Sequence, residues 1–111
     1  MSLSSVFNVI QPTGILDGTR VEELRNEVAQ LLETASDIVL VDLSETSFID
    51  SSGLGALVSM LKMVRAAGRR LCICSPNSQI KMVFELSSMD QAFEIFESRE
   101  AFEQSVLPTP A

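Results

Sequence analysis

Short apolar runs alternate with amphipathic segments along the chain, the pattern expected of a domain built from both strands and helices. Residues 38–43 (IVLVDL) form a nearly continuous apolar run rich in β-branched residues, which predicts a central strand covered on both faces. Residues 70–75 (RLCICS) predict another strand. Apolar residues at helical spacing predict one amphipathic helix over residues 19–34 and a second that starts at Asp50 or Ser51 and ends at Gly68.

The remaining elements follow from the same patterns: strands over residues 6–10, 13–16 and 92–96, and helices capped by Asn77 or Ser78 and by Ser98. Thr19 and Glu22 have the spacing of a capping box, and residues 44–49 are interpreted as a connector. Strands joined through helices should be parallel, whereas the opening pair can be antiparallel. We therefore expect an α/β domain over residues 1–106, with a mixed, mostly parallel sheet of four to five strands and about four helices, followed by a flexible tail over 107–111.

Composition narrows the functional classes. Eight Lys and Arg face fifteen Asp and Glu, giving a formal charge of −7, and no His is present. A direct nucleic-acid binder would carry a basic stripe. The one basic cluster, Arg65, Arg69 and Arg70, lies at the predicted end of a helix, and we interpret it as a group of cations that interact favourably with the exposed carbonyls there. The lack of His excludes a Ser-His-Asp triad and His-ligated metals.

The cysteine spacing and the lack of long apolar runs suggest a cellular location. Cys72 and Cys74 are two residues apart in a predicted strand, so their side chains should share one face and stay buried as reduced thiols. Reduced thiols are typical of a reducing cytoplasm. Because no secretory signal pattern and no apolar run long enough to span a bilayer occur, we expect a cytoplasmic protein without a membrane association.

The segment from Phe48 to Leu57 is the most informative. A carboxylate (Asp50) is followed by two hydroxyls (Ser51 and Ser52) and then by Gly53 and Gly55 at the start of a helix. Each glycine weakens a helix by about 1 kcal/mol relative to Ala, but allows a neighbouring strand or a partner protein to come close. The positive end of the helix can accept a phosphate on Ser51, while the simpler interpretation is that the polar residues only cap the helix.

Asp-Ser-Ser-Gly-Leu-Gly, residues 50–55, resembles the signature of STAS domains of the anti-sigma factor antagonist family. Gly14-Ile15-Leu16-Asp17 is similar to the family's Gly-x-x-Asp, although many members carry an acidic residue where Ile15 stands. The resemblance implies that a partner anti-sigma factor with serine kinase activity phosphorylates Ser51, with Ser52 as a minor alternative. It also implies that a metal-dependent serine phosphatase reverses the modification and that the unphosphorylated form binds the kinase.

The expected partner-binding surface combines the signature with neighbouring residues. It comprises Asp17, Asp50, Ser51, Ser52, Gly53, Leu54, Gly55, Met60 and Met63. The two methionines belong to a second apolar stripe on the helix with Ala56 and Ala67, which suits either protein docking or packing against a neighbouring helix. We expect no catalytic residue, no metal and no cofactor, and the oligomeric state stays open.

The same residues bear on three other functional classes. A response-regulator receiver could use Asp42 or Asp50, but the acidic pair after its first strand and the Lys after its last strand are missing. An enzyme with Ser51 as nucleophile lacks an evident base, although Asp17, Asp42 and Asp50 could gather and bind Mg²⁺ rather than form a solvated acidic rim. The main alternative is a non-catalytic STAS module that binds a small molecule or a signalling partner outside sigma-factor systems.

Overall fold

The structure is a computed structural model, and it describes residues 7–106. A four-stranded parallel sheet has the order β1-β3-β5-β6, made of β1 (Phe7–Ile10), β3 (Ile38–Asp42), β5 (Arg70–Cys74) and β6 (Glu94–Phe96). A separate parallel ribbon pairs β2 (Gly14–Leu16) with β4 (Thr46–Ile49). The helices are α1 (Val21–Leu31), α2 (Ser51–Ala66), α3 (Ser78–Leu86) and α4 (Arg99–Val106), with 3-10 turns at Gly18–Arg20 and Met89–Gln91. The predicted α/β class and the four helices are confirmed.

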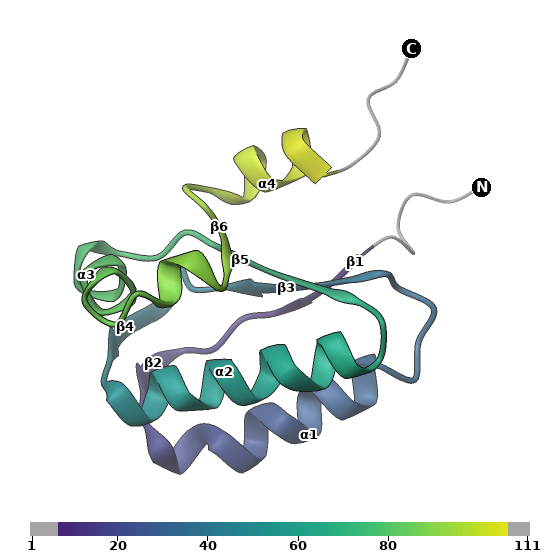
Figure 1. Cartoon of the computed structure of the whole chain (residues 1–111), viewed down its shortest axis with the longest axis horizontal. Coiled ribbons are helices and arrows are strands. Elements are labelled where there is room, and N and C mark those ends of the chain that lie inside the picture. The colour runs from purple at the N-terminus through teal and green to yellow at the C-terminus, as the bar shows by residue number, and fades with distance from the viewer. Residues whose placement is uncertain (1–6, 107–111) are drawn as a thin grey trace.

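Helices cover both faces of the sheet. Figure 1 shows α1 and α2 side by side along one face, α4 on the opposite face and α3 at the end where β4 lies. All five residues of β3 are buried, as predicted for a doubly covered strand. Val39 and Val41 belong to the core cluster under α1 and α2, whereas Ile38 and Leu40 belong to a cluster that includes Phe102 of α4.

The predicted antiparallel opening pair is wrong, and so is the interpretation of residues 44–49 as a connector. β1 pairs with β3 and β2 pairs with β4, and both pairs are parallel. The segment between β1 and β2 crosses to the second ribbon instead of turning back, and the Thr46 hydroxyl holds it by donating to the carbonyl of the buried Pro12 at 2.8 Å. Every strand pair of the described chain is therefore parallel.

Most predicted helix ends are confirmed. The Asn77 side chain accepts from Ile80 N, and the Ser98 hydroxyl accepts from Ala101 N. Gly68 follows α2 with a φ of +73°, the left-handed conformation that ends many helices. The capping box at Thr19 is wrong, because Asp17 caps this turn by accepting from the Thr19 amide.

The two cysteines and the basic cluster also have defined places. Cys72 and Cys74 are free, buried and in one cluster on the α4 side of the sheet, as predicted. The predicted place of the arginines at a helix end is confirmed for Arg65, which lies in the last turn of α2. The side chains of all three also bond to other parts of the chain. Arg65 donates to the Ala92 carbonyl, Arg69 donates to the Ser36 carbonyl, and Arg70 pairs with Glu94 across β5 and β6. Across residues 7–106, no helix has both the length and the apolar character needed to cross a membrane.

Val6 and the predicted tail, residues 107–111, lie outside the described residues. The predicted boundary of the domain at residue 106 therefore stays a prediction.

Candidate functional site

The candidate site lies where β4 ends and α2 begins. Asp50 has an extended backbone, and its carboxylate accepts from Gly53 N at 2.8 Å, so it is the N-cap of α2. Its carbonyl accepts from Leu54 N and thereby begins the helical bonding. Ser51 is the first residue of the helix and is exposed. Asp50 thus provides the cap, and the Ser51 side chain remains exposed to solvent.

The two glycines of the signature have different environments. A Cβ on Gly53 would lie 1.9 Å from the Leu16 carbonyl oxygen and 3.0 Å from Cγ1 of Ile49. A Cβ on Gly55 would meet nothing within 4 Å, and this residue is exposed. Of the two close approaches considered from the sequence, Gly53 therefore serves the neighbouring strand β2, while Gly55 leaves open surface beside Ser51.

The turn at Asp17 packs against the second serine. A Cβ on Gly18 would lie 3.3 Å from the Ser52 Cβ, so the turn and the start of α2 are in close contact. The hydroxyl and the amide of Thr19 both donate to the Asp17 carboxylate, and these bonds hold the pKa of that carboxyl below its ordinary value. Asp17 is therefore a charged turn residue that borders the site through the Gly18–Ser52 contact.

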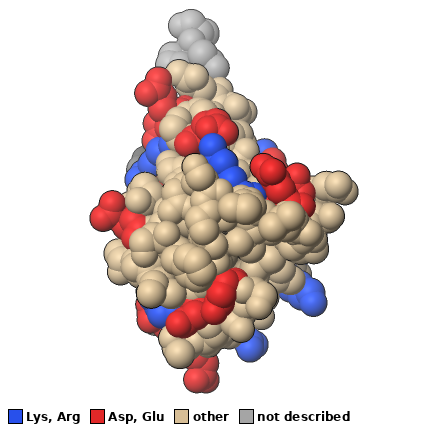
Figure 2. Space-filling view, turned by 90° about the vertical axis from the view of Figure 1, so that its left-hand side faces the viewer, with Lys and Arg blue, Asp and Glu red and all other residues tan. Residues whose placement is uncertain are grey.

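Charge lies at the margins of this end of the molecule. Figure 2 looks at the end formed by α3, β4 and the start of α2, and uncharged atoms fill the centre of this face while Lys, Arg, Asp and Glu side chains lie around it. Arg20, which follows the Asp17 turn, donates to the carbonyls of Thr13 and Ile15 and pairs with Glu23. Its guanidinium is thus engaged in holding β2.

Exposed apolar side chains occur on β2, β4 and α3. Ile15 and Phe48 are paired in register across β2 and β4, and they are 56% and 45% exposed. Met82 and Leu86 on α3 are exposed as well. Within the described chain these four are the large apolar residues left open to solvent. A protein partner that contacts this face would bury apolar surface next to Ser51.

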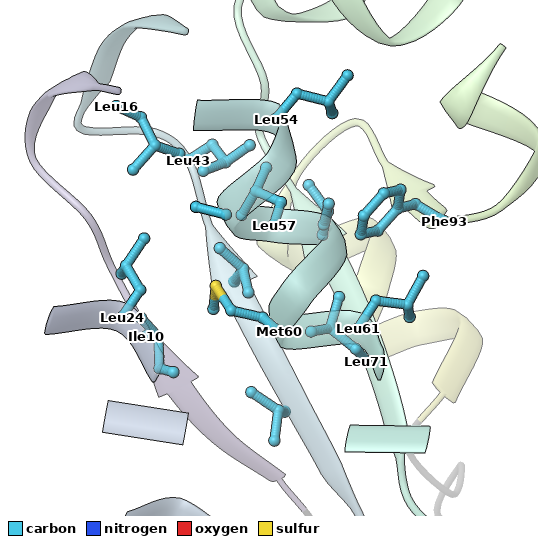
Figure 3. Packing of buried hydrophobic residues seen from close by; sticks show 14 of the residues in the cluster. Ile10, Leu16, Leu24, Leu43, Leu54, Leu57, Met60, Leu61, Leu71 and Phe93 are labelled. Carbon is cyan, nitrogen blue, oxygen red and sulfur yellow. The ribbon is translucent and has the colours of Figure 1, made fainter. Parts of the chain in front are cut away.

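The predicted surface role of Met60 is wrong. Met60 has no exposed area, and it belongs to the core cluster with Leu24 and Ile10. Figure 3 shows its side chain directed from α2 into this core. Met63 is half-buried and packs against the same cluster, and Leu54 is also buried. Of the two interpretations of the second stripe, packing against the neighbouring element is the correct one for Met60.

Of the predicted surface residues, the structure leaves Asp50, Ser51, Ser52 and Gly55 exposed together at the start of α2, with Asp17 half-buried. Neither Phe48 nor Ile15 was predicted from the sequence to lie on this surface. A signal was present, because Ile15-Leu16 and Phe48-Ile49 are adjacent apolar pairs in strands. Neighbours in a strand point to opposite faces, so one member of each pair faces outward where the strand is covered on one face only.

The carboxylates considered for Mg²⁺ have separate roles. Asp50 caps α2 and Asp17 caps the first 3-10 turn. Asp42 is buried and accepts from Ser44 N and from the Gln11 side chain, so it is no part of a solvated rim. Among residues 7–106, no three His, Cys, Asp or Glu side chains are grouped so that they could hold a metal ion.

Comparison with known proteins adds to this geometry. The family model described as "STAS domain" matches residues 4–102. BtrV of Bordetella bronchiseptica, a candidate anti-sigma factor antagonist, is 28% identical over 88 residues, which cover 79% of this chain and 76% of that protein.

Two solved structures show the same fold at low identity. The anti-sigma factor antagonist SpoIIAA in its unphosphorylated form superposes with a TM-score of 0.76 at 22% identity, covering 99% of this chain and 96% of that one. A sulfate transporter family protein from Wolinella succinogenes superposes with a TM-score of 0.79 at 14% identity, covering 93% and 88%. The fold alone therefore does not distinguish between these two functional classes.

Proposed function

The chain belongs to the STAS domain family, and from this premise we propose that it is an anti-sigma factor antagonist switched by phosphorylation of Ser51. In the proposed cycle, the unphosphorylated form binds an anti-sigma factor that is also a serine kinase. Phosphorylation at Ser51 ends that binding, and a metal-dependent serine phosphatase restores it. The similarity to BtrV supports the choice of an antagonist over a transporter-linked module.

The exposure of Ser51 at the start of α2 is the observation that carries the proposal. A kinase can reach this hydroxyl without unfolding the domain, because the cap is provided by the neighbouring Asp50. Ser51 also borders the exposed Gly55 and follows the strand that carries Phe48. A partner that covers this face would therefore cover the acceptor serine as well.

The fold should tolerate the phosphate. A phosphoserine adds about −1.5 to −2 charges. Its repulsion from Asp50 at the surface costs about 1 kcal/mol, and the positive end of α2 returns about 0.3–1 kcal/mol. Because these contributions nearly cancel, modification should change what the surface binds rather than how the chain folds.

Partner binding should not tolerate it. The strands beside Ser51 carry the exposed apolar side chains of Ile15 and Phe48, and a partner that buries them would also shield a phosphate on Ser51 from water. A buried charge without a partner costs about 3–5 kcal/mol, a hundredfold or more in affinity. The proposed switch therefore acts by excluding the partner from the surface.

The protein itself acts on no substrate in this proposal. Asp50, the carboxylate next to Ser51, is engaged with Gly53 N, and the chain contains no His that could activate a serine. The chemistry belongs to the kinase and the phosphatase.

The test is the affinity of the phosphorylated and unphosphorylated chain for a serine-kinase anti-sigma factor, measured by calorimetry. Tight binding of the unphosphorylated form alone supports the proposal. Equal affinity of both forms would contradict the switch. Binding of a small molecule or of another signalling protein, with no binding to the kinase, would favour the alternative of a different STAS module.

A further inference from the structure

The strand that leads to Ser51 is held on both sides. One side of β4 pairs with β2. On its other side, at the start of α3, the Asn77 side chain donates to the Ser47 carbonyl at 3.0 Å. Two residues further along each element, the Gln79 side chain meets Ile49. Two amide side chains thus take the place of a third strand along this edge.

Gln79 makes the closer fit, because its side chain engages both main-chain groups of one residue. Its Oε1 accepts from Ile49 N at 3.0 Å, and its Nε2 donates to the Ile49 carbonyl at 2.8 Å. A primary amide carries an acceptor and a donor side by side in this way, whereas an ionised carboxylate carries acceptors alone. Glu could keep the first bond, but its carboxylate would face the Ile49 carbonyl with no proton to donate.

Ile49 is the last residue of β4, and Ser51 follows two residues later. Downstream of Ser51, Gly53 is fixed by the Asp50 cap and by its contact with the Leu16 carbonyl. The segment that carries the acceptor hydroxyl is therefore held by contacts at both ends. On the N-terminal side, the contact from α3 is the pair of hydrogen bonds between Gln79 and Ile49, and Gln79 lies outside the signature.

We propose that Gln79 is a positioning residue for phosphoryl acceptance at Ser51, an inference that rests on the proposed function. Phosphoryl transfer needs the attacking oxygen in line with the transferred group, and a misplacement of about 1 Å can cost a hundredfold in rate. By holding both main-chain groups of Ile49, Gln79 fixes the main chain just before Ser51. It thereby helps to set the position of the Ser51 hydroxyl when the kinase binds. Its loss should lower the turnover of the kinase on this substrate more than the binding of the substrate.

The first test needs no partner. Amide hydrogen exchange is measured by NMR for the wild-type chain and for Gln79→Ala, Gln79→Glu and Asn8→Ala. Asn8 is the matched control, because its amide also makes two hydrogen bonds, to Thr34 and Ser36, but lies at the start of the sheet. Gln79→Ala should expose the Ile49 amide and speed exchange at Gly53 and Leu54, and Gln79→Glu should keep the Ile49 amide protected. Unchanged exchange at Gly53 and Leu54 in Gln79→Ala would overturn the positioning role.

The second test follows Ser51 phosphorylation with ATP and a purified serine-kinase anti-sigma factor that modifies the wild-type chain. Gln79→Ala should lower kcat about tenfold with KM changed less than about threefold, as expected for lost orientation of the acceptor. Gln79→Glu should fall between it and wild type, and Asn8→Ala should keep the wild-type kcat. An unchanged kcat in Gln79→Ala would overturn the inference alone. A wild-type chain that no such kinase modifies would instead overturn the proposed function, before any Gln79 variant is compared.

Discussion

Gly53 lies so close to Leu16 that a single Cβ on the glycine would stand 1.9 Å from the leucine carbonyl oxygen. This contact joins the first turn of α2 to β2, and a main-chain atom cannot rotate away as a side chain would. The glycine is thus required by the internal packing of the domain, whereas Gly55, two residues later, has open space around it.

Replacing the two glycines separately should therefore give opposite results. Gly53→Ala should lower the free energy of unfolding by about 1–3 kcal/mol, because β2 or α2 must shift to admit the methyl group. Gly55→Ala should leave it unchanged or raise it by up to about 1 kcal/mol, because Ala favours the helix. Urea unfolding of both variants measures the difference. Equal stabilities would show that the contact yields without cost.

The two serines should differ as phosphate acceptors. Both serines are exposed, but the Ser52 Cβ lies close to Gly18 in the Asp17 turn, while Ser51 is the first residue of α2. With ATP and a serine-kinase anti-sigma factor, Ser51→Ala should lose phosphate incorporation and Ser52→Ala should keep most of it. Intact mass and peptide mapping measure both. Phosphate found mainly on Ser52 would contradict the assignment of the acceptor.

The order of strands and helices could be predicted because local patterns determine it. The β-branched run at 38–43 and the caps at Asn77 and Ser98 each act within a few residues. Strand partners depend on contacts far apart in the chain, and no local signal placed β2 beside β4. A Gln-Pro pair such as Gln11-Pro12 is typical of a turn, but the Thr46 hydroxyl, 34 residues from Pro12, holds that segment on a crossing path.

The part of the site that lies within the signature could also be predicted from local patterns. The sequence shows that a strand ends and a helix begins at Asp50 and Ser51. Met60 was misplaced because helical spacing identifies an apolar face without saying what covers it, and the core covers this one. Gln79 lies 28 residues beyond Ser51, so its bonds to Ile49 follow only from the tertiary fold.

The exposed pair Ile15 and Phe48 should contribute to partner binding more than to stability. Cross-strand pairs of this kind contribute about 0.2–1 kcal/mol to folding, so Ile15→Ser and Phe48→Ser should remain folded. An aromatic side chain buried at an interface can contribute about 2 kcal/mol, so Phe48→Ser should weaken binding to the kinase about thirtyfold.

The contrasting variant is Met60→Ala, which should cost about 2–5 kcal/mol of stability because it opens a cavity in the core. Thermal unfolding and calorimetry separate the two effects. Unchanged affinity in both Ile15→Ser and Phe48→Ser would remove this pair from the proposed surface. A loss in Leu86→Ser as well would extend the surface along α3.

The buried thiols should make stability depend on alkaline pH. Burial, with a smaller effect of Glu94, raises the pKa of Cys72 from 9.0 to about 11, and burial also raises the pKa of Cys74. The folded state therefore favours the protonated thiol. This contribution is fully present below pH 9, where the unfolded thiol is also protonated, and it is lost as pH rises from about 9 to about 11.

Urea unfolding between pH 8 and pH 11 measures this dependence, with Cys72→Ala as the control that cannot ionise at this position. The stability advantage of the wild-type chain over Cys72→Ala should shrink as pH rises. The chain contains no Tyr, so no phenol titrates in the same range. A difference that stays constant across this range would mean that the Cys72 thiol ionises equally in both states.

The switch at Ser51 should separate binding from folding. Ser51→Ala should bind a serine-kinase anti-sigma factor like the wild-type chain but accept no phosphate there. Ser51→Asp adds one charge where a phosphate adds about −1.5 to −2, so it should weaken binding less than phosphorylation does. Phosphorylation itself should reduce affinity by a hundredfold or more, because the contact with the partner would bury the charge of the phosphate.

The fold should be the same in all these forms, because the repulsion from Asp50 and the attraction to the start of α2 nearly cancel. Circular dichroism spectra should therefore coincide, and unfolding free energies should agree within about 1 kcal/mol. If the phosphorylated chain lost both its affinity and its spectrum, the phosphate would act by disrupting the junction between β4 and α2. Lost affinity with an intact spectrum is the result expected when the phosphate keeps the partner off the surface.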